Sequence, residues 1–162
     1  METIEAIYSA LQGLNIEFKE YSHPPVYTCE EAEIYYKDIP GGVSKNLFLR
    51  NKKGNQHYLV VVESNKQVDL LQLSIQINDH KLGFASPERM DKYLKTKPGS
   101  VSPFGLIFDQ EKHIKVIVDQ DLLAHEQVHY HPNDNTKTVI IKSEDLKRFL
   151  QEYAREVNYM KL

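Results

Sequence analysis

A buried strand with a lysine near its beginning is predicted by Val43-Ser44-Lys45-Asn46-Leu47-Phe48-Leu49-Arg50. A strand with one face in solvent alternates polar and apolar residues with a period of two. Residues 47–49 do not alternate, so both faces of this strand are expected to be buried. Lys45 and Asn46 then lie where the strand leaves the Pro40-Gly41-Gly42 turn, and a cation and an amide there can orient an anionic or ester-bearing ligand. The alternative is an ordinary solvated lysine at a strand end.

The surrounding sequence extends this strand into a sheet. Residues 45–50 and 57–63 flank the turn sequence 51–55, which predicts a β-hairpin. The remaining predicted strands are a short one around Ile16 and Phe18, a second hairpin of 106–108 with 114–118, and two strands near 127–131 and 138–142.

Apolar residues at helical spacing separate these strands. The expected helices are 4–14, 28–36 after a capping-box pattern, 68–75, one starting at Ser86-Pro87, and one from Ser143 that includes Val157. Strands in hairpins with irregularly placed helices favour an α+β fold over a doubly wound parallel sheet. We therefore expect a single domain spanning 1–162, built on a mixed sheet or a partly closed barrel with surrounding helices.

Length and composition limit the classes of protein to consider. The 162 residues fit one domain with a substantial core, and 41% hydrophobic with 27% charged residues is a globular composition. No apolar run approaches the roughly 20 residues that span a bilayer, and the acidic N-terminus lacks the layout of a signal peptide. The single cysteine, Cys29, excludes an internal disulfide and a cysteine-based zinc site. The expected location is the cytoplasm, with no membrane partner.

The net charge of −3 argues against capture of nucleic acid by the overall field. The cations are clustered in the sequence, at 45–53, at 92–97 and at 137–142. A nucleic-acid partner would therefore have to contact a local patch, with modest and salt-sensitive binding; simple solvated faces are the alternative.

A second unusual segment is Lys97-Pro98-Gly99-Ser100-Val101-Ser102-Pro103-Phe104-Gly105. Two prolines and two glycines in nine positions predict a stiff loop that can bring backbone groups close to a ligand. The phosphate-binding pattern Gly-x-x-x-x-Gly-Lys-[Ser/Thr] is missing. An ordinary structural turn is the other interpretation.

Three histidines near residue 130 form the third feature. On a strand, His129 and His131 would face the same side, with His125 four residues earlier. A three-histidine metal site is conceivable, but no carboxylate at metal-ligand spacing supports it. The preferred interpretation is a functional His131, presented by a fixed turn at His131-Pro132, and no metal.

Nucleophilic catalysis has little support in the sequence. There is no Gly-x-Ser-x-Gly elbow, and Cys29 has no evident partner base. A small buried or pocket-lining residue is the better interpretation of Cys29.

Four segments in order resemble the YbaK-type editing domains related to the insertion domain of bacterial prolyl-tRNA synthetase, most closely the freestanding ProX/PrdX branch. The segments are 23–32, 44–50, 98–106, and His131-Pro132 through Asn135-Thr136. Each alone is weakly specific, but four in family order over most of the chain are strong.

The resemblance implies a mixed sheet curled toward a barrel, and metal-independent hydrolysis of the ester between a wrong amino acid and tRNA(Pro), without a cofactor. Lys45 matches the family's essential lysine and is the expected catalytic residue. The residues expected to bind substrate are Asn46, Ser102, Pro103, Phe104, Gly105, His131, Thr28 and Cys29. The implied partners are the charged acceptor end of tRNA(Pro) and, further, prolyl-tRNA synthetase.

The implied chemistry needs few protein groups. An aminoacyl ester is already reactive, so positioning of water and stabilisation of the developing oxyanion can suffice. We expect the Lys45 ammonium to act as an electrostatic clamp, the backbone near Phe104 and Gly105 to hold the acyl group, and His131 to border a small pocket. Alanine is the expected acyl group. Cys29 in the pocket segment keeps cysteine or another small amino acid open, and a non-catalytic module that binds aminoacyl-tRNA or an amino acid is the alternative class.

Overall fold

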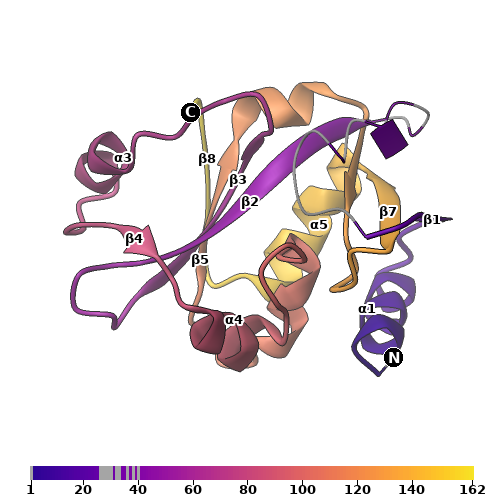
Figure 1. Cartoon of the computed structure of the whole chain (residues 1–162), viewed down its shortest axis with the longest axis horizontal. Helices are drawn as coiled ribbons and strands as arrows, with labels where there is room; N and C mark the ends of the chain where they lie inside the picture. Colours follow the sequence, from indigo (N-terminus) through magenta and orange to yellow (C-terminus); the bar gives the residue numbers. More distant parts are fainter. Residues whose placement is uncertain (1, 26–30, 32–33, 36, 38, 40) are drawn as a thin grey trace.

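Strand β2 (Gly42–Arg50) lies inside the sheet that organises the molecule (Figure 1). The computed structural model describes residues 2–25, 31, 34–35, 37, 39 and 41–162. Within them the strand order is β1-β7-β6-β2-β3-β5-β8, with β4 paired to β2 beside this path. The bounds are β1 Lys19–Ser22, β3 His57–Glu63, β4 Gly83–Phe84, β5 Lys115–Asp119, β6 Gln127–Tyr130, β7 Lys137–Lys142 and β8 Val157–Met160.

The sheet is mixed and open. The pairs β2–β3, β2–β4, β6–β7 and β1–β7 are antiparallel, whereas β2–β6, β3–β5 and β5–β8 are parallel. Since β1 and β8 end the strand order without pairing to each other, the barrel is not closed among the described residues. This confirms the predicted fold class, a mixed sheet with surrounding helices.

The two faces of the sheet carry two separate hydrophobic clusters. The larger cluster contains Phe48 of β2 and buried side chains of α1 (Glu2–Gly13), α4 (Pro87–Leu94) and α5 (Ser143–Tyr153). The smaller cluster contains Leu49 and Leu73, the latter from α3 (Leu70–Gln76). Because Phe48 and Leu49 are 1% and 0% exposed, β2 is buried on both faces there, as its sequence predicts.

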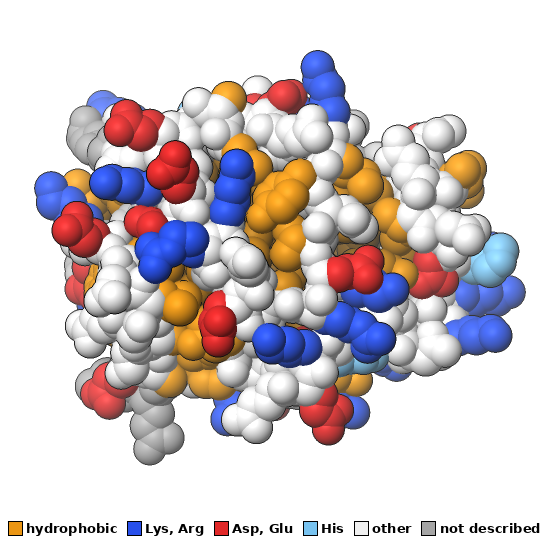
Figure 2. All heavy atoms as spheres, turned by 180° about the vertical axis from the view of Figure 1, so that it is seen from behind, with side chains coloured by type: hydrophobic (Ala, Val, Ile, Leu, Met, Phe, Trp, Pro, Cys, Tyr) orange, Lys and Arg blue, Asp and Glu red, His pale blue; other side chains and the backbone are white. Residues whose placement is uncertain are grey.

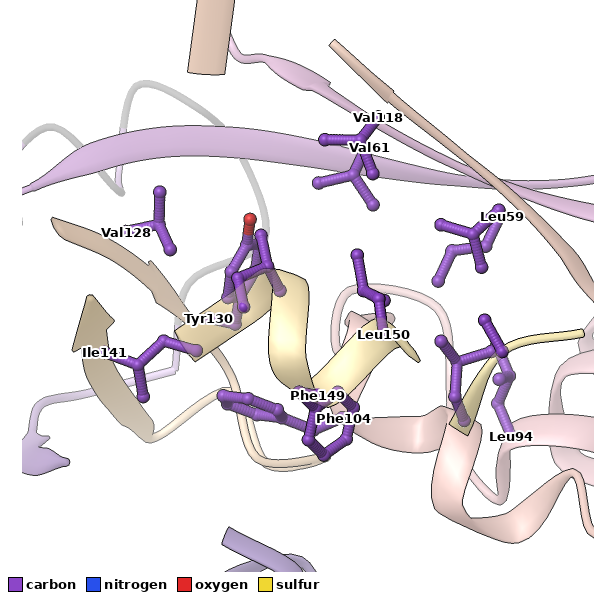
Figure 3. Packing of buried hydrophobic residues seen from close by; sticks show 14 of the residues in the cluster. Leu59, Val61, Leu94, Phe104, Val118, Val128, Tyr130, Ile141, Phe149 and Leu150 are labelled. Carbon is purple, nitrogen blue, oxygen red and sulfur yellow. The ribbon is translucent and has the colours of Figure 1, made fainter. Parts of the chain in front are cut away.

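Aromatic residues fill the centre of the larger cluster (Figure 3). The ring of Phe104 meets Phe149 edge-on at 5.5 Å and Tyr130 edge-on at 5.8 Å, the geometry that aromatic pairs prefer. Figure 3 shows Val61 and Leu59 of the sheet on the side of the cluster away from the rings of Phe104 and Phe149. Phe104 thus joins the proline- and glycine-rich loop to the core.

Most predicted elements are confirmed, and three are wrong. Residues 103–108 are not a strand, because Ser102 caps and Pro103 opens a 3₁₀ helix, η1 (Pro103–Phe108). The predicted second hairpin is therefore absent, and β5 pairs instead with β3 and β8. The last helix ends at Tyr153, so Val157 belongs to β8, and the first strand begins at Lys19, after Ile16 and Phe18.

A further 3₁₀ helix, η2 (Gln120–Ala124), links β5 to β6. The helix predicted for 28–36 lies mainly outside the described residues. No helix in the described part of the chain has the length and apolar character needed to cross a membrane.

Candidate functional site

Among the described strands, β2 has a neighbour on one side only at Lys45. On that side Lys45 pairs with Val62 of β3. On the other side β6 pairs only with Gly42 and Val43, and β4 only with Leu49 and Arg50. Residues 43–47 are accordingly half-buried, in contrast to the buried residues that follow. Among the described residues, Lys45 has neither an ion pair nor a hydrogen-bonded partner, so its ammonium charge is available to a ligand.

Lys45 shares a face of the sheet with two histidines. Val43 pairs with His129 in the parallel ladder of β2 and β6, so these two side chains lie on one face. Alternation places Lys45, two residues after Val43, on this face too, and His131, two residues after His129, in the same direction. Because β6 ends at Tyr130, the register places His129 but not His131, and the common side of these two histidines stays a prediction.

The imidazole of His131 is held by the backbone. Its Nδ1 lies 2.8 Å from the carbonyl oxygen of Lys137. A carbonyl only accepts, so Nδ1 carries the hydrogen and donates. His23, whose ring centre is 6.0 Å from that of His131, is fixed in the same way: its Nδ1 donates to the carbonyl of Pro24, and its Nε2 lies 2.7 Å from the hydroxyl of Thr138.

Burial keeps His129 and His131 from adding positive charge. His129 is 4% exposed, and burial, with a smaller effect of His131 and His23, lowers its pKa to about 4. Burial also lowers the pKa of His131, against the opposing effect of its hydrogen bond to Lys137. Loss of hydration disfavours the charged form of a histidine. At neutral pH the positive charge of this face therefore comes from Lys45 rather than from His129 or His131.

The proline- and glycine-rich loop reaches the unpaired edge of β2 from the opposite face. Nδ2 of Asn46 donates a 3.0 Å hydrogen bond to the carbonyl oxygen of Val101, and Oδ1 of Asn46 accepts from Ser44. The loop then turns into η1, where Ser102 Oγ accepts from the backbone N–H of Phe104. The edge of β2 is thus bordered by the loop on one face and by Lys45 and the histidines on the other.

Gly105 has a packing role. A Cβ at this position would lie 3.1 Å from both the Cβ and the carbonyl oxygen of Leu94, which is tighter than nine in ten real Cβ contacts. Gly105 and Phe104 are buried, so η1 packs directly against the end of α4.

The predicted site residues therefore fall into three groups. Lys45, Asn46 and His131 lie around the edge of β2. Ser102, Pro103, Phe104 and Gly105 are buried in the loop and η1 behind that edge. Thr28 and Cys29 lie outside the described residues. The roles of all these residues in binding and catalysis stay predictions.

Sequence reasoning missed His23 and Thr138 as parts of this site. His23 belongs to the His23-Pro24-Pro25 segment, and its backbone N–H donates to the carbonyl of Thr136, which brings it to β7. The two prolines indicate that this segment is extended, but the sequence does not show that it lies against β7.

His125 pairs with Glu63 at 2.7 Å, and no group of three potential metal ligands occurs among the described residues.

Comparison with known proteins agrees with the family resemblance seen in the sequence. Residues 23–149 match the model of the aminoacyl-tRNA editing domain. The chain is 41% identical over 151 residues to the prolyl-tRNA editing protein ProX of Acetoanaerobium sticklandii, covering 93% of this chain and 92% of that protein. It is 35% identical to prolyl-tRNA synthetase associated domain-containing protein 1 of Danio rerio, covering 88% and 78% of the two chains.

A solved structure shares the fold. It is described as a candidate trans-editing enzyme for prolyl-tRNA synthetase, and it superposes with a TM-score of 0.75 over 98% of this chain and 96% of its own. Its sequence identity of 20% supports the fold alone.

Proposed function

The chain belongs to the aminoacyl-tRNA editing domain family, and on this premise we propose that it is a hydrolase that removes wrongly attached amino acids from tRNA(Pro) in trans. The bond broken is the ester between the amino acid and the terminal ribose, and water supplies the attacking oxygen. The extent of the match supports one editing domain over residues 1–162.

The need for such an activity follows from size. A synthetase site built for proline cannot exclude the smaller alanine by steric means. Discrimination by missing methylenes is limited to roughly 10–200-fold, and a second site that admits only the smaller acyl group removes the errors. Alanine is therefore the proposed acyl group, and cysteine is the alternative because Cys29 belongs to the segment proposed to line the pocket with Thr28.

The observation that carries the proposal is the ammonium of Lys45, which no carboxylate of the described residues pairs with, at an edge of β2 that no described strand covers. Hydrolysis passes through a tetrahedral intermediate whose oxygen becomes negative. A fixed cation beside that oxygen stabilises the transition state more than the neutral ester, which is how electrostatic catalysis lowers a barrier. Because the lowered pKa values of His129 and His131 favour their neutral forms, the stabilising positive charge comes from Lys45.

The other site residues have positioning roles in this proposal. Asn46 fixes the loop at Val101, so that backbone groups of the loop can hold the acyl end. His131, held by Lys137, borders the space for the acyl side chain. No protein base is needed where substrate or backbone groups orient the water, because the ester is reactive.

We further propose that the enzyme works in the cytoplasm beside prolyl-tRNA synthetase, from which it would receive mischarged tRNA. The names of the relatives support this partner.

The test is deacylation of tRNA(Pro) charged with alanine, cysteine or proline, by wild type and Lys45→Ala, in EDTA. We expect loss of alanine, with proline spared, and a rate at least about ten-fold lower for the variant with an unchanged circular dichroism spectrum. Binding of alanyl-tRNA(Pro) without hydrolysis by the wild type would instead indicate a non-catalytic module, and inactivation by EDTA would indicate a metal-dependent enzyme.

A further inference from the structure

A second group of cations lies at the other end of β2, and the proposed function does not use it. Arg50 ends β2, and Lys52 and Lys53 are exposed in the turn to β3. Arg89 and Lys92 lie on α4. We call these five residues the turn cluster. Figure 2 shows lysine and arginine side chains gathered toward the lower right, the end of the molecule where the turn between β2 and β3 lies once Figure 1 is turned round.

The guanidinium groups of Arg50 and Arg89 both lie close to Gly54. A Cβ built on Gly54 would lie 2.9 Å from Nη2 of Arg89 and 3.2 Å from Nη1 of Arg50. Nη1 of Arg89 donates to the carbonyl of Gly54 at 3.1 Å and to Nε2 of His57 at 2.8 Å. The Arg89 guanidinium is thus fixed by neutral acceptors, and its charge is not compensated by them.

Carboxylates do not neutralise the turn cluster. Within the described residues no ion pair involves any of its five members. On α4, Glu88 lies four residues before Lys92 and so on the same side of the helix, but no ion pair joins these two among the described residues. The result is a local positive field on a chain of net charge −3.

The positive charge of the turn cluster contributes to a lowered pKa of the neighbouring His57. His57 is fully buried, and burial first, with the charges of His113, Arg89, Lys92 and Arg50 after it, lowers its pKa to about 4. The neutral imidazole can then accept from Arg89, which keeps the guanidinium in place.

We propose that the turn cluster binds phosphate groups in the acceptor stem of the tRNA substrate. Guanidinium groups match phosphate oxygens with two parallel hydrogen bonds, and lysines add charge without fixed geometry. A strand rises about 3.3 Å per residue, so Arg50 lies about 17 Å along β2 from Lys45, and alternation starts its side chain on the opposite face of the strand. An acceptor stem that runs past the turn at the end of β2 would bring phosphates several nucleotides from the ester to the turn cluster while the ester lies at Lys45. This inference rests on the proposed function for the identity of the RNA.

The experiment compares Arg50→Gln/Lys92→Gln with Lys147→Gln/Lys161→Gln, which removes the same charge from exposed residues elsewhere. The side chains of Arg50 and Lys92 make no hydrogen bond or ion pair with described residues, and Lys92 contacts only the ring of the neighbouring Tyr93, so the fold should be retained. Affinity for uncharged tRNA(Pro) is measured from 50 to 300 mM salt. Deacylation is measured on full-length alanyl-tRNA(Pro) and on an alanylated CCA trinucleotide.

For the turn-cluster variant we expect about ten-fold weaker tRNA binding at low salt. The slope of the logarithm of the binding constant against the logarithm of the salt concentration (the salt slope) should be smaller in magnitude by about 2, one for each lost phosphate contact. KM should rise for full-length tRNA, and the trinucleotide should be hydrolysed at the wild-type rate. An unchanged salt slope, an equal loss in the control variant, or an equal loss on the trinucleotide would overturn the inference. Saturable binding of AMP at the turn cluster with no effect of the variant on tRNA would assign it to a free nucleotide instead.

The binding measurement separates this inference from the proposed function. A wild type that hydrolyses nothing would refute the enzyme assignment, and the salt slope for tRNA would still decide whether the turn cluster contacts RNA.

Discussion

Asn46 ties β2 to the proline- and glycine-rich loop, because its Nδ2 donates a 3.0 Å hydrogen bond to the carbonyl oxygen of Val101. Its Oδ1 accepts a hydrogen bond of equal length from the hydroxyl of Ser44. Both ends of one amide are therefore engaged, directly beside Lys45. The position of the loop relative to Lys45, the proposed catalytic residue, depends on this side chain.

We expect Asn46→Asp to lower kcat/KM for alanyl-tRNA(Pro) by at least about ten-fold, because a misplaced loop disturbs substrate orientation. A carboxylate cannot donate to Val101, and the lost bond should lower the free energy of unfolding by about 1–3 kcal/mol. Deacylation kinetics measure the change in kcat/KM, and urea unfolding measures the change in the free energy of unfolding. Ser44→Ala is the control, since it leaves the bond to Val101 intact and should cost less in both assays. Wild-type activity in Asn46→Asp would refute the positioning role.

Gly105 and Gly13 give a matched pair for the packing of η1. We expect Gly105→Ala to lower the free energy of unfolding by about 1–3 kcal/mol, the usual cost of overpacking, because its Cβ would press on Leu94. Gly13→Ala should not destabilise, since its Cβ would meet nothing within 4 Å. Thermal and urea unfolding of both variants test this. Equal stability of the two would show that η1 can move away from α4.

Local patterns were sufficient where neighbours in sequence are neighbours in space. The β2–β3 hairpin and the start of α4 at Ser86-Pro87 could be predicted for this reason. The same local reasoning failed at Leu106–Phe108, because an apolar run of three is compatible with a strand or a 3₁₀ turn, and the cap at Ser102 decided it. β8 was missed because four residues at a sheet edge carry little periodicity.

The candidate site was predictable in its residue types but not in its geometry. Lys45 and His131 could be named from their segments, whereas their shared face depends on the parallel pairing of Val43 with His129. Such a pairing joins strands far apart in the sequence, and local periodicity cannot specify it. The contact of His23 with Thr138 depends on the same kind of long-range pairing.

Acid should destabilise the fold through two buried histidines. The folded-state pKa values of His57 and His129 are lowered from 6.5 to about 4. The unfolded chain therefore binds more protons between these values. The stability that the neutral forms provide is complete above about pH 6.5 and is lost as the pH falls toward 4, by up to about 3 kcal/mol for each histidine.

Urea unfolding at pH 7.5, 6.0 and 5.0 measures this dependence. His57→Gln should flatten it by about half, because glutamine can still accept from Arg89 but does not titrate. His80→Gln changes an exposed histidine and should leave the slope as in wild type. An unaltered slope in His57→Gln would show that other groups cause the acid sensitivity.

His131 should set the upper size limit of the acyl group, because we place its half-buried ring at the border of the acyl pocket. His131→Ala removes the ring and enlarges the space, so prolyl-tRNA(Pro) should become a substrate. We expect the ratio of prolyl to alanyl deacylation to rise at least about ten-fold, within the range that size discrimination can supply. His131→Asn separates volume from positioning, because its amide can replace Nδ1 as the donor to Lys137 while leaving part of the ring volume empty. An intermediate ratio for His131→Asn would assign the effect to volume, and continued sparing of proline by both variants would contradict the placement of His131 at the pocket.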